Sequence, residues 1–522
     1  MTQAQLHATS PFERAPDEVL NEIFMHIATE YPENSDCGLL TWPCGPHPLL
    51  PVVQVNKRFN AVASPLLVLR WRLRPTDRNG AKFVLHLLKH PYLRSQVKSL
   101  ALNVLSFERA LQGDDPAPPN NRWPQSYCST EEVELLVQSA ERIYPPLADW
   151  RGDEEGLSWT GQIAQRSPGA IAALAVAWAT ELSTLDLTLD FWASGEPDPW
   201  LIQLVKMVVG VLSVPEGQDR DLSSPAMFTK LRCVSLGHWD TEGSMDGRIA
   251  APFFRLPGLR VFRAYAMEAA GLTLDEADSS GSGTAIQPLA DQLFPNGTSD
   301  VEELHINRSF ITDNGIRVLT RACRRLRVLI LQWGGSLVSE EESEFSSESI
   351  ANAISLHADS LEEVRIDCYE DLWVQYCDNA DPGSLGDCLV HCNKLKHLAI
   401  DLVVLYGLDD YDQNSASQPL SKVLPPSLIS LRLAFEPASA GDQVTQENLV
   451  DLLRECGPKG RFPNLKKLDL TRCMDETEDY QDLLALAQEA GVDLMLRIRS
   501  AGSVIPRHTS TTVGSVTTVG FQ

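Results

Sequence analysis

The stretch that decides the fold is VEELHINRSFITDNGIRVLTRACRRLRVLIL, residues 301–331. It opens with apolar residues at alternate positions, a pattern typical of a short strand with one buried face. After ITDNG the apolar spacing changes to three and four, which places Ile316, Leu319 and Cys323 on one face of a helix. Alternation then returns in RVLIL. The stretch therefore predicts a strand, a helix and a second strand.

The strand pattern recurs along the chain as an apolar triplet whose members are three and then two positions apart. Its middle residues are Leu100, Leu185, Val234, Phe262, Leu304, Leu329, Val364, Leu398, Leu431 and Leu468. From Leu304 onward these residues are separated by 25, 35, 34, 33 and 37 positions, which leaves room for a helix and two loops. One strand and one helix cannot bury their own apolar faces. The recurrence therefore predicts an α/β solenoid over residues 93–499, with parallel strands on one side and helices on the other.

The array is irregular. Insertions rich in Pro, Gly, Ser or Asp are expected at about residues 106–130, 144–168 and 275–300. An acidic serine-rich segment, residues 339–349, is expected to be a solvated loop or a phosphorylation site. Residues 500–522 lack periodicity, and we expect a disordered tail there.

Composition narrows the classes of function. The 522 residues are 43% hydrophobic and 22% charged, which is typical of a globular protein, and the net charge is −26. That charge argues against a nucleic-acid backbone or an anionic membrane as the main partner. It fits either simple solubility or a preference for basic partner surfaces.

Targeting signals and cysteines favour the cytosol or the nucleus. Residues 1–13 lack the basic start and apolar run of a secretory signal. The most apolar segments, residues 170–179 and 201–214, are too short to span a bilayer and are interpreted as buried helices. The 11 cysteines are scattered and odd in number, as expected for reduced thiols.

Two apolar stripes at helical spacing lie near the N-terminus, on either side of a Pro-, Gly- and Cys-rich segment at residues 31–48. The first comprises Val19, Leu20, Ile23, Phe24 and Ile27, and the second Val52, Val55, Phe59 and Val62. Pro16 suits the first turn of the first helix, where its missing N–H is not needed. A module of about sixty residues forms a small core, so part of the stripes stays exposed unless a partner covers it.

The same segments, APDEVLNEIFMHI (residues 15–27) and LLPVVQVNKRFNAVASPLL (residues 49–67), resemble the F-box. That motif begins Leu-Pro, continues with Glu-Val-Leu and Ile-Phe, and ends in a helix of the form Val-x-(Lys/Arg)-x-(Trp/Phe). The matching positions are Pro16, Glu18, Val19, Leu20, Ile23, Phe24, Leu50, Val52, Val55, Lys57, Arg58, Phe59 and Leu66. Ala15 replaces the usual Leu, and the insertion at residues 31–48 separates halves that are usually close.

Residues 311–331 are in turn similar to the cysteine-containing leucine-rich repeat found behind many F-boxes, as is Thr471-Arg472-Cys473 after the last triplet. The two resemblances imply a non-catalytic substrate receptor of an SCF-type ubiquitin ligase. An F-box-like module at residues 12–72 would dock a Skp-type adaptor and, through it, a cullin, while the repeats would hold an unknown protein substrate. The implied adaptor-binding residues are Pro16, Val19, Leu20, Ile23, Phe24, Leu50, Val52, Val55 and Phe59.

Two other classes of function stay open. In the first, the chain is a leucine-rich scaffold that never joins a ligase, and its N-terminal helices only cap the solenoid. In the second, an enzyme site lies unrecognised in a repeat loop. No catalytic motif supports the second class, and we expect no enzyme activity and no cofactor.

Aromatic residues and cysteines supply the remaining candidates. Trp239, Trp333, Tyr369 and Trp373 fall just after predicted strands, where they serve either as substrate-binding anchors or as packing between repeats. The one group that resembles metal ligands is Cys377, Cys388, His391 and Cys392. Zinc sites show tighter, repeated pairs, so we expect buried thiols and no metal.

Overall fold

The computed structural model describes residues 11–29, 47–73, 77–103, 122–148, 158–189, 199–210, 227–238, 244–268, 289–309, 311–333, 346–368, 384–406, 419–434, 446–471, 480–498 and 509–512. The chain divides into two compact units, Met1–Trp239 and Asp240–Gln522. In both units, parallel strands alternate along the chain with helices.

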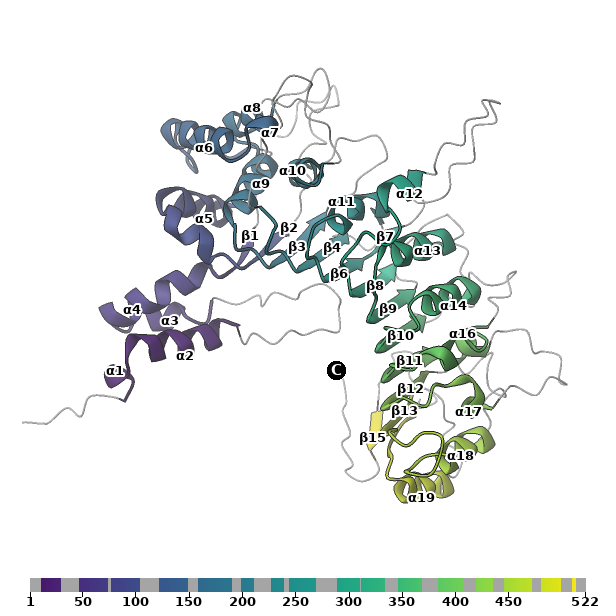
Figure 1. Ribbon diagram of the computed structural model, residues 1–522. Helices are drawn as coiled ribbons and strands as arrows, with labels where there is room; N and C mark the ends of the chain where they lie inside the picture. Colours follow the sequence, from purple (N-terminus) through teal and green to yellow (C-terminus); the bar gives the residue numbers. More distant parts are fainter. Residues whose placement is uncertain are drawn as a thin grey trace, which may run out of the picture. The chain divides into compact units, whose positions relative to one another are not determined.

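The first unit opens with short helices and continues with strand–helix repeats (Figure 1). Its opening helices are α1 (Pro11–Arg14), α2 (Asp17–Thr29), α3 (Leu50–Val53), α4 (Lys57–Ala63) and η2 (Ser64–Val68). We call residues 11–29 and 47–69 the N-terminal module. The repeats of this unit comprise β1 (Arg70–Leu73), α5 (Arg78–Lys89), η3 (Pro91–Gln96), β2 (Ser99–Asn103), α6 (Thr130–Ile143), α7 (Pro145–Ala148), α8 (Trp159–Ala164), α9 (Pro168–Trp178), β3 (Thr184–Leu189), α10 (Trp200–Val208) and β4 (Cys233–His238).

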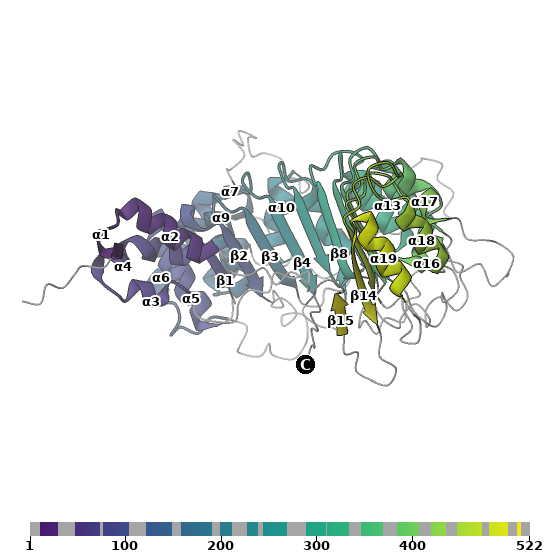
Figure 2. The same cartoon turned by 90° about the horizontal axis from the view of Figure 1, so that it is seen from below.

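Strands β1, β2, β3 and β4 pair in that order, all parallel, and lie side by side in Figure 2. Leu100, Leu185 and Val234 are partners in register and are completely buried. They are middle residues of the predicted triplets, so the triplets mark β2, β3 and β4.

The second unit repeats the same plan. It contains β5 (Met245–Asp246), η6 (Gly247–Ala250), α11 (Ala251–Phe254), β6 (Val261–Tyr265), β7 (Met267–Glu268), α12 (Leu289–Leu293), β8 (Glu303–Ser309), α13 (Asp313–Ala322), β9 (Val328–Trp333), α14 (Ser347–Leu356), β10 (Glu363–Cys368), η8 (Cys388–His391), β11 (His397–Asp401), α16 (Leu402–Tyr406), α17 (Leu420–Val423), β12 (Ser430–Ala434), α18 (Gln446–Arg454), β13 (Lys467–Thr471), α19 (Gln481–Ala490), β14 (Asp493–Ile498) and β15 (Thr509–Thr512).

Strands β6 and β8 to β14 form one run of parallel neighbours (Figure 1). The predicted triplets again coincide with the strands, because their middle residues are register partners and are buried. These residues are Phe262, Leu304, Leu329, Val364, Leu398, Leu431 and Leu468. The predicted α/β architecture of parallel strands with intervening helices is confirmed.

Local sequence signals explain where helices begin and end. Thr312 caps α13 by accepting a hydrogen bond from the Gly315 N–H (3.2 Å), and Ser346 caps α14 in the same way through Ser349 N–H (3.1 Å). Helix α19 ends at Gly491, whose φ of 70° is in the left-handed region that favours glycine. Helix α9 is apolar on all sides and buried along its length, as expected for residues 170–179.

The structure adds one strand that no apolar triplet marks, and it differs from the sequence interpretation in two places. The added strand is β1, whose sequence RWRL is short and polar but pairs with β2. Residues 144–168 read as a loop, yet α7 and α8 lie within them. Ser158 caps α8, and the Trp159 side chain is completely buried. Four residues of the expected tail, 509–512, form β15, which pairs antiparallel with β14, and the rest of residues 500–522 lie outside the described residues.

Candidate protein-binding surfaces

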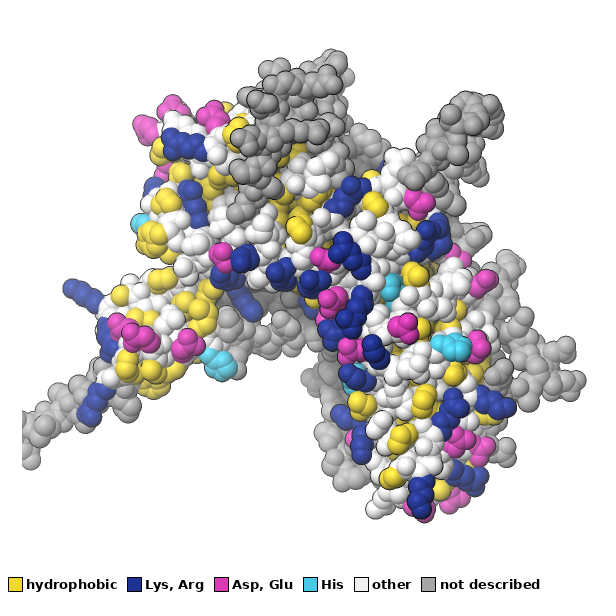
Figure 3. All heavy atoms as spheres, viewed as in Figure 1, with side chains coloured by type: hydrophobic (Ala, Val, Ile, Leu, Met, Phe, Trp, Pro, Cys, Tyr) yellow, Lys and Arg dark blue, Asp and Glu magenta, His cyan; other side chains and the backbone are white. Residues whose placement is uncertain are grey.

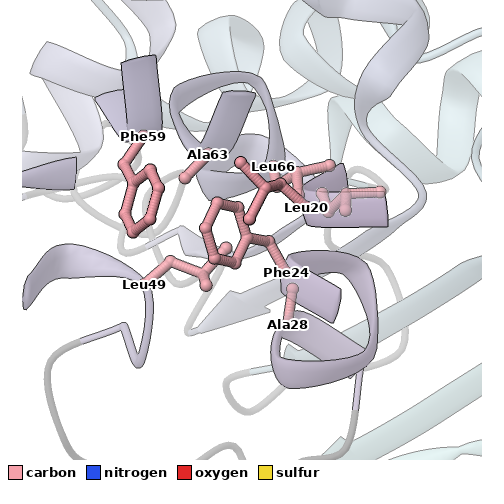
Figure 4. Packing of buried hydrophobic residues seen from close by; sticks show 8 residues of the cluster. Leu20, Phe24, Ala28, Leu49, Phe59, Ala63 and Leu66 are labelled. Carbon is pink, nitrogen blue, oxygen red and sulfur yellow. The ribbon is translucent and has the colours of Figure 1, made fainter. Parts of the chain in front are cut away.

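The N-terminal module is held together by a small apolar core (Figure 4). Phe24 of α2 and Phe59 of α4 pack edge to face, with ring centroids 5.5 Å apart. The buried members are Leu20, Phe24, Ala28, Leu49, Phe59, Ala63, Leu66 and Leu69. Both predicted stripes contribute to this core, so each stripe turns part of its apolar surface inward.

Polar contacts fix the two halves of the module against each other. The Asn56 side chain caps α4 by accepting a hydrogen bond from the Phe59 N–H at 2.8 Å. The Arg58 Nε donates to Asp17 Oδ1 at 2.6 Å, and its Nη2 donates to the Ala15 carbonyl oxygen. Asp17 lies in the first turn of α2 and Arg58 in the first turn of α4. The two halves of the motif therefore meet in space although residues 31–48 separate them in the sequence.

The nine implied adaptor-binding residues divide into three classes of exposure. Leu20, Phe24 and Phe59 are buried in the module's own core, and Ile23 and Val52 are half-buried against it. The exposed members are Pro16, Val19, Leu50 and Val55. Phe24 is only 3% exposed, so the implied role of Phe24 in docking is corrected to a core role.

The exposed members belong to a wider apolar surface. Eight large apolar side chains are exposed among the described residues, and five of them lie in the module: Phe12, Val19, Ile27, Leu50 and Val55. Hydrophobic side chains are visible on the surface of these helices in Figure 3. Exposed apolar surface concentrated on one small module is typical of a protein-binding site.

The module also continues directly into the first repeat. Leu66 and Leu69 belong to the module's core, and β1 begins at the next residue, Arg70. The Leu69 carbonyl oxygen accepts hydrogen bonds from the Lys98 N–H (2.9 Å) and the Ser99 N–H (3.0 Å), at the start of β2. The module therefore covers the β1 end of the first unit's sheet.

The aromatic candidates for substrate binding receive less support. Trp333 is the last residue of β9 and is only 3% exposed. Its indole N–H donates to the Ile311 carbonyl oxygen at 3.4 Å. Trp333 is therefore corrected to a packing residue, the other role that its position allowed. Trp239, Tyr369 and Trp373 lie outside the described residues.

The cysteine cluster holds buried thiols. Cys388 and Cys392 are buried and free, and burial raises the pKa of Cys388 to about 12 and that of Cys392 to about 11. The side chain of His391 is 71% exposed, and Cys377 lies outside the described residues. In the part of the chain that the structure describes, no group of three or more His, Cys, Asp or Glu side chains is placed to hold a metal ion. No described helix is both long and apolar enough to cross a membrane.

A charge ladder that sequence reasoning missed lies at the N-terminal edge of the second unit's sheet. Its five members each stand directly before a strand: Arg260, Glu302, Arg327, Glu362 and Lys396. Arg327 Nε is 2.8 Å from Glu362 Oε1, and Lys396 Nζ is 2.9 Å from Glu362 Oε2. On the other side, Glu302 lies 3.3 Å from Arg260 Nη1 and 3.6 Å from Arg327 Nη1. Alternating charge at this one repeat position was the available signal.

We expect Glu362→Gln to lower the free energy of unfolding by about 1–2 kcal/mol at pH 7. Hydrogen bonds from Arg327 and then Lys396 lower the pKa of Glu362 to about 2. A lowered folded-state pKa gives stability that is present above the unfolded value, roughly 4.3, and is lost as the pH falls toward about 2. Urea denaturation of the variant and the wild-type protein at pH 7 and at lower pH should therefore give a difference that shrinks on acidification.

The matched control is Glu363→Gln, because Glu363 is a half-buried neighbour on the same sheet edge that forms no ion pair with the described residues. We expect a change within about 0.5 kcal/mol for this control. An equal loss in both variants, or a Glu362→Gln loss that is independent of pH, would contradict the ladder's contribution.

Comparison with known proteins gives a distant likeness and no family. No family model matches the chain, and no curated protein matches it significantly. Among solved structures, an internalin from Listeria monocytogenes strain 4b F2365 matches with 13% sequence identity and a TM-score of 0.26, over 63% of this chain and 71% of that one. A TM-score this low supports no conclusion about function. The repeat architecture of this chain rests on its own strands and their register.

Proposed function

We propose that this chain is a non-catalytic protein receptor whose N-terminal module docks a Skp-type adaptor of an SCF-type ubiquitin ligase and whose repeats hold a protein substrate. The observation that carries the proposal is the division of the F-box-like stripes. One part builds a closed core around Phe24 and Phe59, and the other leaves Val19, Leu50 and Val55 at the surface.

The exposed part of the stripes is an apolar surface, and its contact with water is energetically unfavourable. Val19 on α2 is 46% exposed and Val55 in the turn before α4 is 63% exposed, while the hydrogen bond from Arg58 to Asp17 ties α4 to α2. A partner that covers these side chains removes them from water, which contributes a favourable free energy of about 25 cal/mol per Å² of apolar surface buried. Docking of an adaptor's apolar groove on this surface would supply that cover.

The repeats would contribute by holding the substrate in a suitable position. A parallel array of strands and helices offers an extended surface that can hold a partner protein. A substrate bound there would be brought near the adaptor-linked conjugating machinery, which raises the effective concentration of its lysines. No chemistry is required of this chain.

A second candidate is a scaffold that binds proteins without joining a ligase. The continuity of the module with the sheet favours it, because Leu69 serves both the module's core and the backbone hydrogen bonds at the start of β2. A cap of this kind is what the first repeat of a solenoid needs. The two candidates differ in whether the exposed apolar side chains contact an adaptor.

The experiment is co-purification of the full chain with a Skp-type adaptor, using wild-type protein and a Val19→Asp/Val55→Asp variant. We expect the wild type to retain the adaptor and the variant to lose it, by at least about tenfold in affinity, because two unpaired carboxylates would be buried at the interface. Both side chains are exposed in the free chain, so the module stays folded, which circular dichroism verifies.

The matched control is Leu135→Asp/Leu356→Asp, because these leucines are as exposed as Val19 and Val55 but lie on α6 and α14. The control should retain the adaptor. Failure of the wild type to bind any Skp-type adaptor would leave the scaffold as the better function. Equal loss in both double variants would show that added charge, not the module surface, is responsible.

A further inference from the structure

The charge ladder at the N-terminal edge of the second unit's sheet ends at Lys396. From there on, the charged side chains along this edge are predominantly basic. Along β11, β12 and β13 the edge carries six exposed cations: Lys394, Lys396, Lys459, Arg461, Lys466 and Lys467. We call these six residues the basic edge. From Arg260 to Lys396 the charges alternate and pair, whereas the basic edge has an excess of one sign.

Backbone pairing places these cations together. The Lys396 carbonyl oxygen accepts from the Ile429 N–H (2.7 Å), and the Ile429 carbonyl oxygen accepts from the Lys466 N–H (2.8 Å). Lys396, Ile429 and Lys466 therefore hold the same position on three adjacent strands. Neighbouring strands are about 4.8 Å apart, so the two lysines are separated by roughly 10 Å.

The remaining members extend this group along the chain. Lys394 precedes Lys396 by two residues, Lys467 follows Lys466, and Lys459 and Arg461 lie in the turn before β13. Cys456 and Phe462 close that turn with an isolated bridge, and the Arg461 side chain donates to the Leu424 carbonyl oxygen at 3.4 Å. The turn is thereby tied to the sheet edge.

Most of these charges have no acidic partner among the residues that the structure describes. Lys394, Lys459, Lys466 and Lys467 form no ion pair with any described residue, while Lys396 is paired with Glu362. Asp493 is the register partner of Lys467, yet the two side chains form no ion pair. Lys and Arg side chains are seen gathered along the strands of the second unit in Figure 3.

We infer that the basic edge binds a segment of the partner protein that is rich in Asp and Glu. In a chain with a net charge of −26, an exposed group of cations, most of them unpaired among the described residues, contrasts with the negative charge of the chain and is complementary to an acidic ligand. This inference rests on one part of the proposed function, namely that the repeats bind a protein.

The acidic surroundings of the edge favour a short acidic peptide over nucleic acid. Five of the six cations are lysines, which act as point charges and can pair with the carboxylates of such a peptide. A long polyanion would extend beyond the roughly 10 Å of the edge into the field of an acidic protein, which repels it. A short carboxylate-rich peptide contacts the edge alone.

The test is fluorescence anisotropy of a fluorescein-labelled tetrapeptide of alternating Glu and Ser, titrated with the full chain. Wild-type protein should bind it, with an affinity that falls as NaCl rises from about 50 to about 300 mM. The variant Lys394→Glu/Lys466→Glu/Lys467→Glu should bind about tenfold more weakly, because attraction is replaced by repulsion at three positions.

The matched control, Lys82→Glu/Arg142→Glu/Lys230→Glu, changes the net charge equally at exposed positions of the first unit and should bind within about twofold of wild type. No binding by wild type, or equal weakening in both variants, would overturn the inference. Tighter binding of a single-stranded oligo(dT) decamer than of the peptide would also overturn it, in favour of nucleic acid. The Lys394/Lys466/Lys467 variant should still co-purify with the adaptor, because its N-terminal module is unchanged. Loss of peptide binding with the adaptor retained therefore concerns the basic edge alone and not the proposed function.

Discussion

Replacing Phe24 by alanine is expected to unfold the N-terminal module, with a loss of about 3–5 kcal/mol. Phe24 is 3% exposed and packs edge to face on Phe59, in a core of only eight buried residues. A small core has few other contacts to compensate for a cavity of this size. Hydrogen exchange of the α2 and α4 amides, with urea denaturation alongside, measures the loss.

The control for this prediction is Phe12→Ala. Phe12 belongs to the same module but is 52% exposed, so its removal should change stability by less than about 0.5 kcal/mol. If the two alanine variants behaved alike, Phe24 would not be a core residue, and its implied role in adaptor docking would return. If Phe24→Ala unfolds the module as expected, a loss of adaptor binding by this variant would not identify the docking surface. The Val19→Asp/Val55→Asp variant tests that surface, because both side chains are exposed.

Replacing His357 by alanine is expected to destabilise the protein by roughly 1–3 kcal/mol, since it leaves the buried Leu326 N–H without its acceptor. The Thr320 carbonyl oxygen loses one hydrogen bond but keeps the one from the Cys323 N–H at 3.1 Å. The buried His357 ring lies at the end of α14. Its Nδ1 accepts from the Leu326 N–H at 3.4 Å, so Nε2 carries the proton and donates to the Thr320 carbonyl oxygen at 3.0 Å. One imidazole thus joins two consecutive repeats. Urea denaturation at about pH 7.5, which is roughly 1 unit above the pKa of a free histidine, measures the loss.

The His357 contribution should also depend on pH. Burial lowers the pKa of His357, because the charged ring is poorly solvated there and its Nδ1 could no longer accept a hydrogen bond. A lowered folded-state pKa means that the stability is complete above the unfolded value, about 6.5, and decreases as the pH falls toward the folded value. The difference between wild type and His357→Ala should therefore shrink below about pH 6.5.

His391→Ala provides the comparison, because the His391 side chain is 71% exposed. Its effect should stay within about 0.5 kcal/mol at every pH. A His357→Ala loss that matched this control, or one that did not change on acidification, would show that the imidazole does not join the repeats as its hydrogen bonds indicate.

Side-chain periodicity alone determined much of this fold. The apolar triplets located the strands from β2 to β13 except the two-residue strands β5 and β7, because alternate apolar residues on a short run have one way to reach a core. The spacing between triplets indicated parallel strands with a helix between them, and the all-apolar α9 was recognisable as buried. The same reasoning placed helices in both halves of the N-terminal module, although the second stripe divides between α3 and α4 at the extended Asn56.

Periodicity could not decide which stripe residues face inward. Phe24 and Val19 share one helical stripe, yet one is buried and the other is exposed, because the choice depends on how α4 packs across α2. Trp333 was ambiguous for the same reason, since a residue at a strand end can turn toward the core or toward solvent. Strand β1 gave too short and too polar a signal to be found at all.

The sequence by itself determined the repeating unit, the two candidate helices of the module and the excess of negative charge. Only the tertiary structure decided which charges meet. Glu362 lies next to Arg327 and Lys396 although each is about 35 residues away, roughly one repeat along the solenoid, because the strand register aligns equivalent positions. Register also groups Lys396 with Lys466, which forms no ion pair with any described residue. Composition is a property of the chain, but pairing depends on distance, and folding sets the distances.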